Sequence, residues 1–325
     1  MIGISGLGNY VPETKCLVSD ICKDLNTDEL RKIGVESVPR ETQNTAAEMA
    51  TIASKRALDD AGIKPVDLDL IINTQAGLHD HLLWQVSAKI QSDLGAGNAN
   101  FVDLYQGCSG FMFALILAKQ ILSATETNSH ILINTGEKWS ESIQGYRTNK
   151  IVFGEAAVAA VVDNKSTGNF ILGHSLLSDG SLHDISMMSM GTSNPPRLIK
   201  NKEDYFYSVR NLEKAKKNLI PVNIERFHRV GLEAVKNSNL TFEDISSIIF
   251  PSVGFGLFEK VMATFEFPLE KTNFRYVKHT GDCGSVGEML SYHRMINDQL
   301  IKKGDNVLIL SQGAGFTWSA IVIEV

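Results

Sequence analysis

The 325-residue sequence is poor in cysteine, and its four cysteines, Cys16, Cys22, Cys108 and Cys283, are not spaced like a zinc site or a disulfide framework. It also lacks any run near the roughly 18 apolar residues of a membrane span. The N-terminus has neither the cationic region nor the apolar segment of a cleavable signal. We therefore expect a cytoplasmic protein that neither crosses a membrane nor holds a structural metal.

An excess of positive charge is missing as well. The 31 Lys and Arg residues are outnumbered by 37 Asp and Glu residues, which gives a net charge of −6. Because nucleic acids and anionic membranes attract basic surfaces, neither is expected as a partner. The balance of 43% hydrophobic and 21% charged residues is typical of a soluble enzyme.

What the sequence does contain is one pattern of elements that occurs twice. Residues 56–73 predict an amphipathic helix, an acidic turn and a buried strand, and residues 231–250 repeat this order. Alternating strands and helices predict parallel-type sheets that are covered by helices, so we expect an α/β fold. We divide it into two halves, residues 1–167 and 168–325.

Three further pairs of segments correspond between the halves. The helix-opening turn at 107–110 matches 281–284, the strand at 130–136 matches 307–313, and the Ala- and Val-rich final strands are 156–162 and 319–325. Two related halves would bring their helix-opening turns together near a pseudo-twofold axis. Cys108 and Asp282 are therefore expected to occupy equivalent corners of one central site.

Cys108 lies between a predicted strand, Asn100–Leu104, and a predicted helix, Phe111–Leu122. A thiol at a helix start faces unpaired backbone N–H groups and the positive end of the helix dipole, and both favour the nucleophilic thiolate. Gly107 and Gly110 leave room for the carbonyl of another molecule. The alternative interpretation of this local sequence is a small buried side chain at a tight turn.

Four segments match a known family in order and spacing: 89–95, 107–111, 153–157 and 313–318. Over nearly its whole length the chain resembles β-ketoacyl-acyl-carrier-protein synthase III, a condensing enzyme of the thiolase superfamily. The resemblance implies a thiolase fold with five αβαβα layers built from two pseudo-symmetric halves. It also implies a homodimer without a permanently bound cofactor.

The resemblance assigns the nucleophile to Cys108, which would take an acyl group from a thioester of coenzyme A or of an acyl carrier protein. The tetrahedral oxyanion would be held by the backbone N–H groups of Cys108 and Ala314. The family usually has glycine at the second position. Alanine serves there provided that it avoids positive φ.

The sequence departs from the family at two positions of the resemblance. The His and Asn that stabilise the enolate in decarboxylative condensation are replaced by Ser252 and Asp282. A Ser hydroxyl can donate one hydrogen bond, whereas an ionised Asp only accepts and would repel the enolate. Losing such a donor costs about 3–4 kcal/mol of transition-state stabilisation. Decarboxylative carbon–carbon bond formation is therefore expected to be disfavoured.

An Asp beside an acyl-cysteine suits a different second step. Asp282 could deprotonate an alcohol or amine, or orient His279 at the end of a predicted strand, Asn273–Lys278. A Cys–His–Asp arrangement resembles the family's acyltransferase branch. The structural alternatives are that His279 caps backbone carbonyls and that Asp282 caps a helix.

We therefore predict an acyltransferase that passes the acyl group from Cys108 to an amine or hydroxyl of a small-molecule acceptor. The first alternative is a decarboxylating synthase in fatty-acid or polyketide-type biosynthesis. The second is a degenerate condensing subunit that depends on a partner protein.

In the family, an Arg before the Phe-Gly-Asp/Glu strand and residues of an early loop contact coenzyme A. Arg147 matches the first, and Arg31 and Lys32 stand in the loop at 30–35, which lacks the family's Trp. Weaker adenine stacking leaves an acyl carrier protein as plausible a donor as coenzyme A. The alternative for Arg147 is a solvated charged turn.

The segment 77–84 corresponds to the family loop that crosses the dimer interface and lines the partner's acyl pocket. This assigns His81, Leu83 and Trp84 to that pocket. His79 and His81 have no third ligand at metal spacing, so no metal site is predicted.

Overall fold

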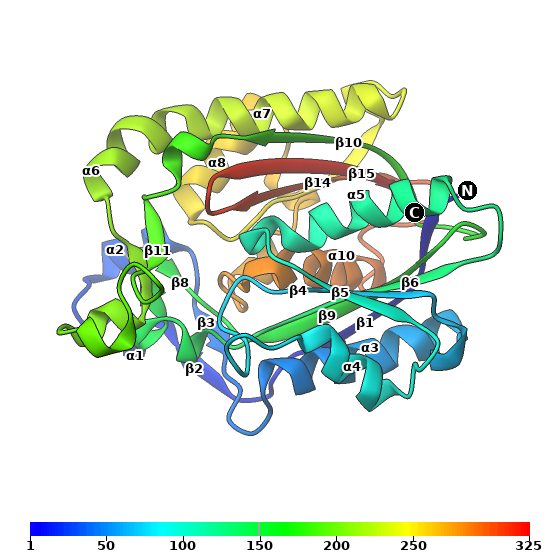
Figure 1. Cartoon of the computed structure of the whole chain (residues 1–325). Coiled ribbons are helices and arrows are strands. Elements are labelled where there is room, and N and C mark those ends of the chain that lie inside the picture. Colours follow the sequence, from blue (N-terminus) through cyan, green and yellow to red (C-terminus); the bar gives the residue numbers. More distant parts are fainter. Residues whose placement is uncertain (149) are drawn as a thin grey trace.

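Nine strands form the centre of the molecule, in the order β13-β14-β15-β10-β1-β9-β6-β4-β5 (Figure 1). The computed structural model describes residues 1–148 and 150–325. The strands are β1 (Gly3–Tyr10), β4 (Leu70–Thr74), β5 (Asn100–Leu104), β6 (His130–Glu137), β9 (Ala156–Asp163), β10 (Phe170–Ser178), β13 (Ile245–Ile249), β14 (Asn306–Gly313) and β15 (Thr317–Glu324). Strands β1 and β10 are joined through a single residue pair, Gly3 and Phe170. The nine strands therefore divide at this point into two groups, β5 to β1 and β10 to β13.

The two groups repeat one pairing pattern. In the first, β4 runs parallel to β5 and β6, and β9 runs antiparallel between β1 and β6. In the second, β13 runs parallel to β14, and β15 runs antiparallel between β10 and β14. Thr272 forms a parallel bridge to Ile248 of β13, at the place that β5 takes in the first group. The predicted boundary at residue 167 lies in the turn between β9 and β10.

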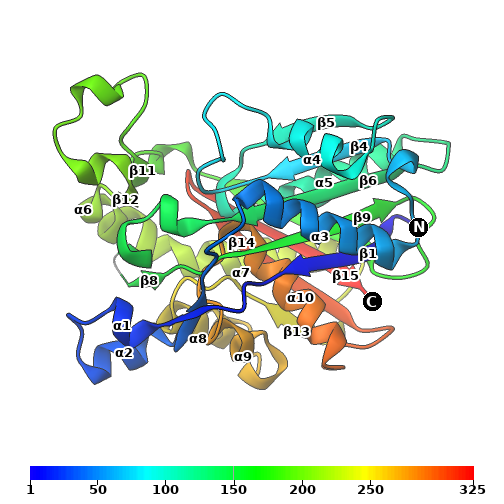
Figure 2. The same cartoon turned by 90° about the horizontal axis from the view of Figure 1, so that it is seen from below.

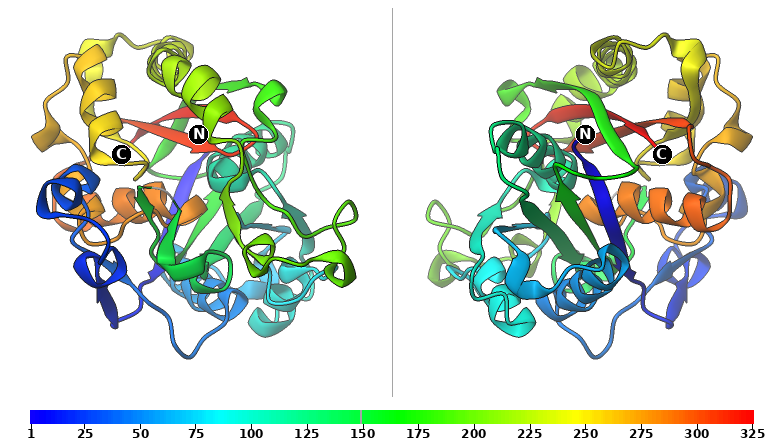
Figure 3. Two further views of the ribbon diagram at one scale, coloured as in Figure 1. Left: turned by 90° about the vertical axis from the view of Figure 1, so that its left-hand side faces the viewer. Right: turned by 90° about the vertical axis from the view of Figure 1, so that its right-hand side faces the viewer.

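Helices cover both groups and also lie between them, which gives the predicted five αβαβα layers (Figure 3). The helices are α3 (Ala46–Ala61), α4 (Val86–Leu94), α5 (Gly110–Ser123), α7 (Ile220–Asn237), α8 (Phe255–Thr264) and α10 (Gly287–Asn297). One buried cluster joins α5 and α10 to both groups of strands. A second cluster joins α3 and α4 to the first group, and a third joins α7 and α8 to the second group. This is the thiolase fold. No helix in the described part of the chain is long and apolar enough to cross a bilayer.

Strand β9 is rich in Ala and Val because both of its faces are buried. Successive side chains of a strand point to opposite faces. Ala156, Val158 and Ala160 therefore join the cluster between the sheets, while Ala157 and Ala159 join the cluster under α3 and α4. A strand that is buried on both faces reads as a continuous apolar run, as this one does.

Shorter elements form two additions to the layers. They are β2 (Lys15–Leu17), α1 (Val18–Ile21), α2 (Thr27–Ile33), β3 (Ser37–Pro39), β7 (Arg147–Thr148), β8 (Ile151–Val152), β11 (Ser186–Met188), β12 (Tyr207–Val209), α6 (Leu212–Lys214) and α9 (Phe274–Val277). The segment with α1 and α2 and the segment with β11, β12 and α6 both lie at the end of the molecule opposite the two termini (Figure 2).

Two local predictions are wrong. The predicted strand Asn273–Lys278 is the short helix α9, and the predicted loop at 30–35 begins within helix α2. The Asn273 side chain accepts from the Phe250 N–H at 3.0 Å and donates to the Phe250 carbonyl at 3.0 Å. These bonds use the backbone groups that a continuing strand would have paired, and the chain turns into a helix instead.

Helix α3 approaches β1 so closely that glycine is required on the strand. A Cβ on Gly8 would lie 2.1 Å from the Ala53 carbonyl oxygen and 2.4 Å from the Ala57 nitrogen. Backbone atoms of a packed helix cannot yield locally, so we expect Gly8→Ala to lower the free energy of unfolding by about 1–3 kcal/mol or more. Denaturant unfolding measures it.

Gly97→Ala is the matched control, because a Cβ on Gly97 would meet no atom within 4 Å. It should change stability by no more than about 0.5 kcal/mol. Equal stabilities of the two variants would contradict the close approach of α3 to β1.

Candidate active site

Cys108 lies in a single 3₁₀ turn, Gly107–Ser109, that leads into α5. The matching 3₁₀ turn, Gly284–Val286, leads into α10 and contacts the first one. The turn around Cys108 is held against strand β15, because the hydroxyls of Ser109 and Ser319 lie 2.6 Å apart. Two equivalent helix starts therefore meet at the centre of the molecule, and Cys108 is partly accessible there.

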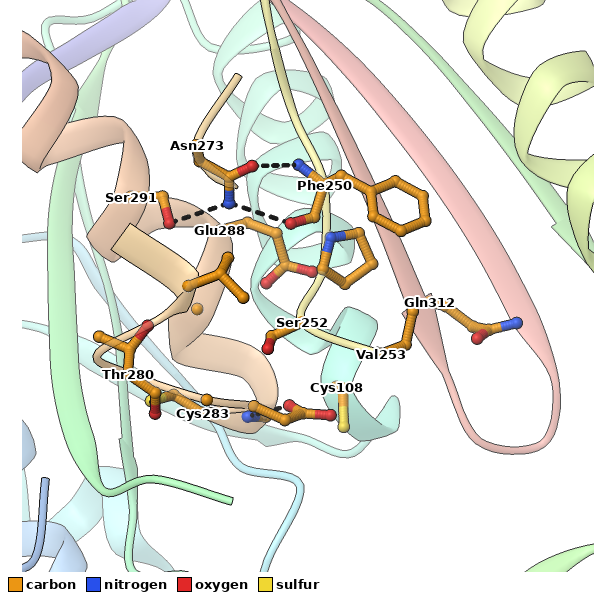
Figure 4. A pocket seen from close by; sticks show the side chains of 16 residues that line it. Cys108, Phe250, Ser252, Val253, Asn273, Thr280, Cys283, Glu288, Ser291 and Gln312 are labelled. Carbon is orange, nitrogen blue, oxygen red and sulfur yellow. Dashed lines mark hydrogen bonds between the residues drawn. The ribbon is translucent and has the colours of Figure 1, made fainter. Parts of the chain in front are cut away.

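A small cavity joins the key side chains of both halves. It has a volume of about 20 Å³, and Cys108, Ser252, Asp282 and Glu288 are among its lining residues. In Figure 4 the Ser252 side chain lies between those of Glu288 and Cys108. The structure thus brings Cys108, Ser252 and Asp282 together, although they are far apart in the sequence.

Two larger cavities also reach Cys108. One, of about 390 Å³, runs along mostly apolar side chains to Lys150 and Lys260. The other, of about 460 Å³, extends past Leu78, His79 and three methionines, Met187, Met188 and Met190. Cys108 therefore lies where three spaces meet, and a substrate group could reach the sulfur through either of the two larger ones.

The environment of Cys108 favours the thiol, which corrects the sequence-based expectation of a thiolate. Burial raises the pKa of Cys108 well above its usual value, and the nearby carboxyls of Asp282, Glu137 and Glu288 raise it further. A backbone hydrogen bond at the helix start acts in the opposite direction and is the weaker influence. The resting nucleophile must therefore give up a proton when it attacks.

The carboxyl of Asp282 is held close to half-protonated at neutral pH. Burial raises its pKa to about 7, the backbone N–H of Gly284 acts against this rise, and the charge of Glu137 adds to it. That N–H donates to Asp282 Oδ1 at 2.8 Å. A carboxyl in this range is present both as an acceptor-only anion and as an acid that can donate a hydrogen bond.

Glu137, at the end of β6, holds the two walls of the site together. Its buried carboxyl accepts from the N–H groups of Ala76 and Gly77 at 2.7 and 2.9 Å, and from the Ser285 hydroxyl at 2.7 Å. Burial raises its pKa, and these donors oppose the rise. Glu137 thereby ties the loop after β4 to the turn that carries Asp282.

Comparison with known proteins agrees with this architecture. Residues 102–180 match the family 3-oxoacyl-[acyl-carrier-protein (ACP)] synthase III, and residues 235–325 match 3-oxoacyl-[acyl-carrier-protein (ACP)] synthase III C terminal. The chain is 29% identical to β-ketoacyl-[acyl-carrier-protein] synthase III of Caldanaerobacter subterraneus, over 99% of this chain and 97% of that one. The chain belongs to the synthase III family.

Another relative and two solved structures are similar along their full length. The enzyme of Vesicomyosocius okutanii is 28% identical over 99% of this chain and 98% of its own. The 3-oxoacyl-[acyl-carrier-protein] synthase III structure from Aquifex aeolicus superposes with a TM-score of 0.85 at 22% identity and covers 100% of both chains. A ChlB3 acyltransferase structure has a TM-score of 0.87 at 20% identity and covers 100% of this chain and 97% of its own. At these identities the structures show the shared fold.

His279 is not part of the site in this synthase III family member. Its side chain is exposed, and it does not line the cavity that joins Cys108 to Asp282. It follows α9 rather than a strand, and its backbone N–H donates to the Tyr276 carbonyl at 3.0 Å. The predicted Cys–His–Asp arrangement is therefore not assembled.

The backbone near Ala314 does lie beside the nucleophile turn. A Cβ on Gly107 would be 3.3 Å from the Ala314 nitrogen, and one on Gly313 would be 3.1 Å from the Ser109 nitrogen. Ala314 is not among the residues with positive φ, so its methyl group meets the condition set from the sequence. The N–H groups of Cys108 and Ala314 remain the proposed oxyanion hole.

The predicted donor-binding residues lie apart from the cavities at Cys108. The Arg147 guanidinium pairs with Asp24 at 2.9 Å. Arg31 lines a separate cavity of about 470 Å³ beside Phe255, and Lys32 is exposed on α2. The cations that line the space leading to Cys108 are instead Lys150 and Lys260.

The predicted acyl-pocket residues also lie away from the chain's own Cys108. His81 packs edge-on against Trp84 with 5.0 Å between the ring centres, and Leu83 is 109% exposed. The residues of this loop that do line the 460 Å³ cavity are Gly77, Leu78 and His79. A place for the loop tip in the pocket of a second copy stays a prediction, which the exposure of Leu83 supports.

Sequence reasoning missed Glu137 and Glu288. Glu288 is 2% exposed and reaches the small cavity from the first turn of α10. One signal for Glu288 was available in the sequence. Helix α10 is the counterpart of the apolar helix α5, which packs between two layers of strands, so an acidic residue in α10 is unusual. Glu137 gave a weaker signal, as an acidic residue at the end of the buried strand β6.

Proposed function

We propose that the protein is a condensing enzyme that loads an acyl group onto Cys108 and joins it to a decarboxylating malonyl-type thioester. One observation carries this proposal. Asp282, beside Ser252 and Cys108, has its pKa raised to about 7 by burial, so a neutral carboxyl is available near neutral pH. A neutral carboxyl donates a hydrogen bond, as the amide of Asn does, and a buried acid can serve in this way in an oxyanion site.

This proposal revises the expectation that Asp282 disfavours condensation. That expectation assumed that Asp282 is ionised. Because burial raises the pKa of Asp282 to about 7, the neutral acid is present beside the carboxylate near neutral pH. The names of the curated relatives, β-ketoacyl-[acyl-carrier-protein] synthase III, support the revision.

In the first step, the Cys108 sulfur attacks the thioester carbonyl of the donor. The carboxylate form of Asp282 takes the thiol proton and passes it to the departing thiolate, so the donor leaves as a thiol. The backbone N–H groups of Cys108 and Ala314 hold the oxyanion. The products are acyl-Cys108 and free coenzyme A or carrier-protein thiol.

Before the second step the Asp282 carboxylate takes a proton from solvent. Neutral Asp282 and the Ser252 hydroxyl then donate to the thioester carbonyl of the malonyl group. Carbon dioxide leaves, and the enolate formed is stabilised by these two donors. Its carbon attacks the acyl carbonyl, a carbon–carbon bond forms and the bond to sulfur breaks. The Cys108 thiolate then takes a proton from solvent, through Asp282, and returns to the thiol.

Transfer to an amine or hydroxyl is the second candidate. It is favoured by the same carboxyl, because the anion present above about pH 7 could deprotonate an acceptor. The similarity in fold to a ChlB3 acyltransferase is compatible with it. The two candidates need opposite protonation states of Asp282.

Intact-mass measurement separates the candidates. The protein is incubated with an acyl thioester of coenzyme A or of an acyl carrier protein, and the acyl-enzyme is then given malonyl thioester or a panel of alcohols and amines. The proposal predicts an acyl adduct that is lost with one equivalent of carbon dioxide. Loss to alcohols or amines alone would contradict it, and failure to form an adduct would contradict both candidates and favour a partner-dependent subunit.

Lys260 lines the space that leads to Cys108 and is exposed. Both donors carry phosphate on their pantetheine arm, so we expect Lys260→Glu to raise the KM for the acyl donor about 2- to 5-fold with kcat unchanged. Steady-state kinetics with each donor measure this effect. Lys303→Glu, outside the cavity, is the control, and equal KM changes in the two variants would remove Lys260 from the donor path.

A further inference from the structure

The small cavity behind Cys108 contains two buried polar atoms without a partner. Among the described residues, Ser252 Oγ and Glu288 Oε1 are both enclosed and make no hydrogen bond. Unpaired buried polar atoms are rare, because each loses its interaction with water. The volume of about 20 Å³ is enough for about one water molecule.

The other polar side chains on the cavity wall already have partners. Asn273 binds both backbone groups of Phe250 and donates to Ser291 Oγ at 3.1 Å. The Thr280 hydroxyl donates to the Tyr276 carbonyl at 3.0 Å. On the cavity wall, Ser252 and Glu288 are therefore left to interact with each other, directly or through one water, or with a substrate. The buried Ser311 hydroxyl on β14, which also makes no hydrogen bond within the described part of the chain, is the further group that acts on Glu288.

We propose that Glu288 is a positioning residue that fixes the direction in which the Ser252 hydroxyl donates its hydrogen bond. A neutral Glu288 donates toward Ser252 Oγ, so the single Ser252 proton points to the substrate carbonyl. An ionised Glu288 accepts instead, takes that proton into its own hydrogen bond and leaves the substrate carbonyl without this donor. One intervening water transmits either direction unchanged. The inference rests on the proposed condensing function.

The charges around Glu288 keep it neutral under ordinary conditions. Burial raises its pKa to about 8, the Ser311 hydroxyl on β14 acts against the rise, and the charge of Asp282 adds to it. The titratable groups that face the cavity are Asp282 and the thiols of Cys108 and Cys283, with Glu137 behind them on β6. The lining residues include no Lys, Arg or His that would stabilise the anion.

The test measures carbon dioxide release from preformed acyl-enzyme as a function of pH. Glu288→Gln keeps a donor and cannot ionise, so it should retain the rate near neutral pH and lack a further fall of about 10-fold that the wild type shows above about pH 8. Glu288→Leu has no donor and should be about 10-fold slower than Glu288→Gln at every pH. Preformed acyl-enzyme is used because Glu288 also influences the Cys108 thiol, whose acylation is a separate step.

A double-mutant cycle separates this role from a merely structural one. If Glu288 acts through Ser252, Glu288→Leu should have no added effect in a Ser252→Ala background. Additive effects, or identical pH profiles for Glu288→Gln and the wild type, would overturn the inference while leaving the condensing function in place. A wild-type acyl-enzyme that releases no carbon dioxide would contradict the condensing function and this inference with it. If Glu288→Leu does not fold, the pH profile of Glu288→Gln still decides.

Discussion

Asp282→Asn should release carbon dioxide from the acyl-enzyme at alkaline pH, where the wild type loses this activity. The amide donates a hydrogen bond at every pH, whereas the Asp282 carboxyl, with a pKa raised to about 7, donates only in its acid form. Asp282→Ala removes the donor and should be about 10²- to 10³-fold slower than Asp282→Asn at every pH. Single-turnover release of labelled carbon dioxide measures both effects.

The same pair of variants separates the two candidate functions. If Asp282 acts as a general base toward an alcohol or amine, Asp282→Asn should lose about 10²- to 10⁴-fold in transfer and gain nothing at high pH. Asp298→Asn makes the same chemical change far from the site, where Asp298 accepts from the Tyr276 hydroxyl, and it should leave the profile unaltered. An Asp282→Asn variant that is as inactive as Asp282→Ala would contradict the role of a neutral donor.

Cys108→Ala should form no acyl adduct, and its turnover should fall by on the order of 10⁵-fold or more. Cys108 lines both of the larger cavities through which an acyl donor could enter, and Cys283 lines neither. Intact mass after exposure to an acyl thioester measures the adduct, and product formation measures turnover.

Cys283→Ala is the matched control for the nucleophile. Cys283 lines the small cavity, but it is buried and its thiol donates to the Thr280 carbonyl at 3.4 Å. The adduct should form normally on this variant. An adduct that survives in Cys108→Ala and disappears in Cys283→Ala would transfer the nucleophile to the other half of the molecule.

The sequence was sufficient to predict the layers and the two corners of the site. Repeated order, apolar periodicity and the turns before two helices are local signals, and they located Cys108 and Asp282 because related halves place equivalent turns together. Strand β9 could also be predicted from the sequence, because a strand that is buried on both faces has an uninterrupted apolar run of residues.

Protonation states could not be predicted in the same way. The thiol form of Cys108 depends on burial and on carboxyls from three separate segments, Glu137, Asp282 and Glu288. A helix start alone suggested the opposite state. The charge of a buried group follows from all its neighbours together, and these are brought close only by the fold.

Side-chain partners were the other limit. Arg147 matched its family position in spacing and stays a predicted donor contact, but spacing could not reveal that its guanidinium pairs with Asp24 from the α1–α2 segment. His279 stood three residues from Asp282, but the Asn273 side chain ends the strand pairing and α9 leaves His279 exposed. Spacing along the chain gave the position of each residue, while its direction was set by contacts from elsewhere.

The most direct test of the account is the pH dependence of carbon dioxide release by the wild-type acyl-enzyme in a single turnover. If neutral Asp282 donates to the enolate, the rate should be highest in acid and fall as the pH rises through about 7. A rate of acyl-Cys108 discharge that instead rises through about 7, with alcohol or amine as the acceptor and no carbon dioxide released, would contradict it.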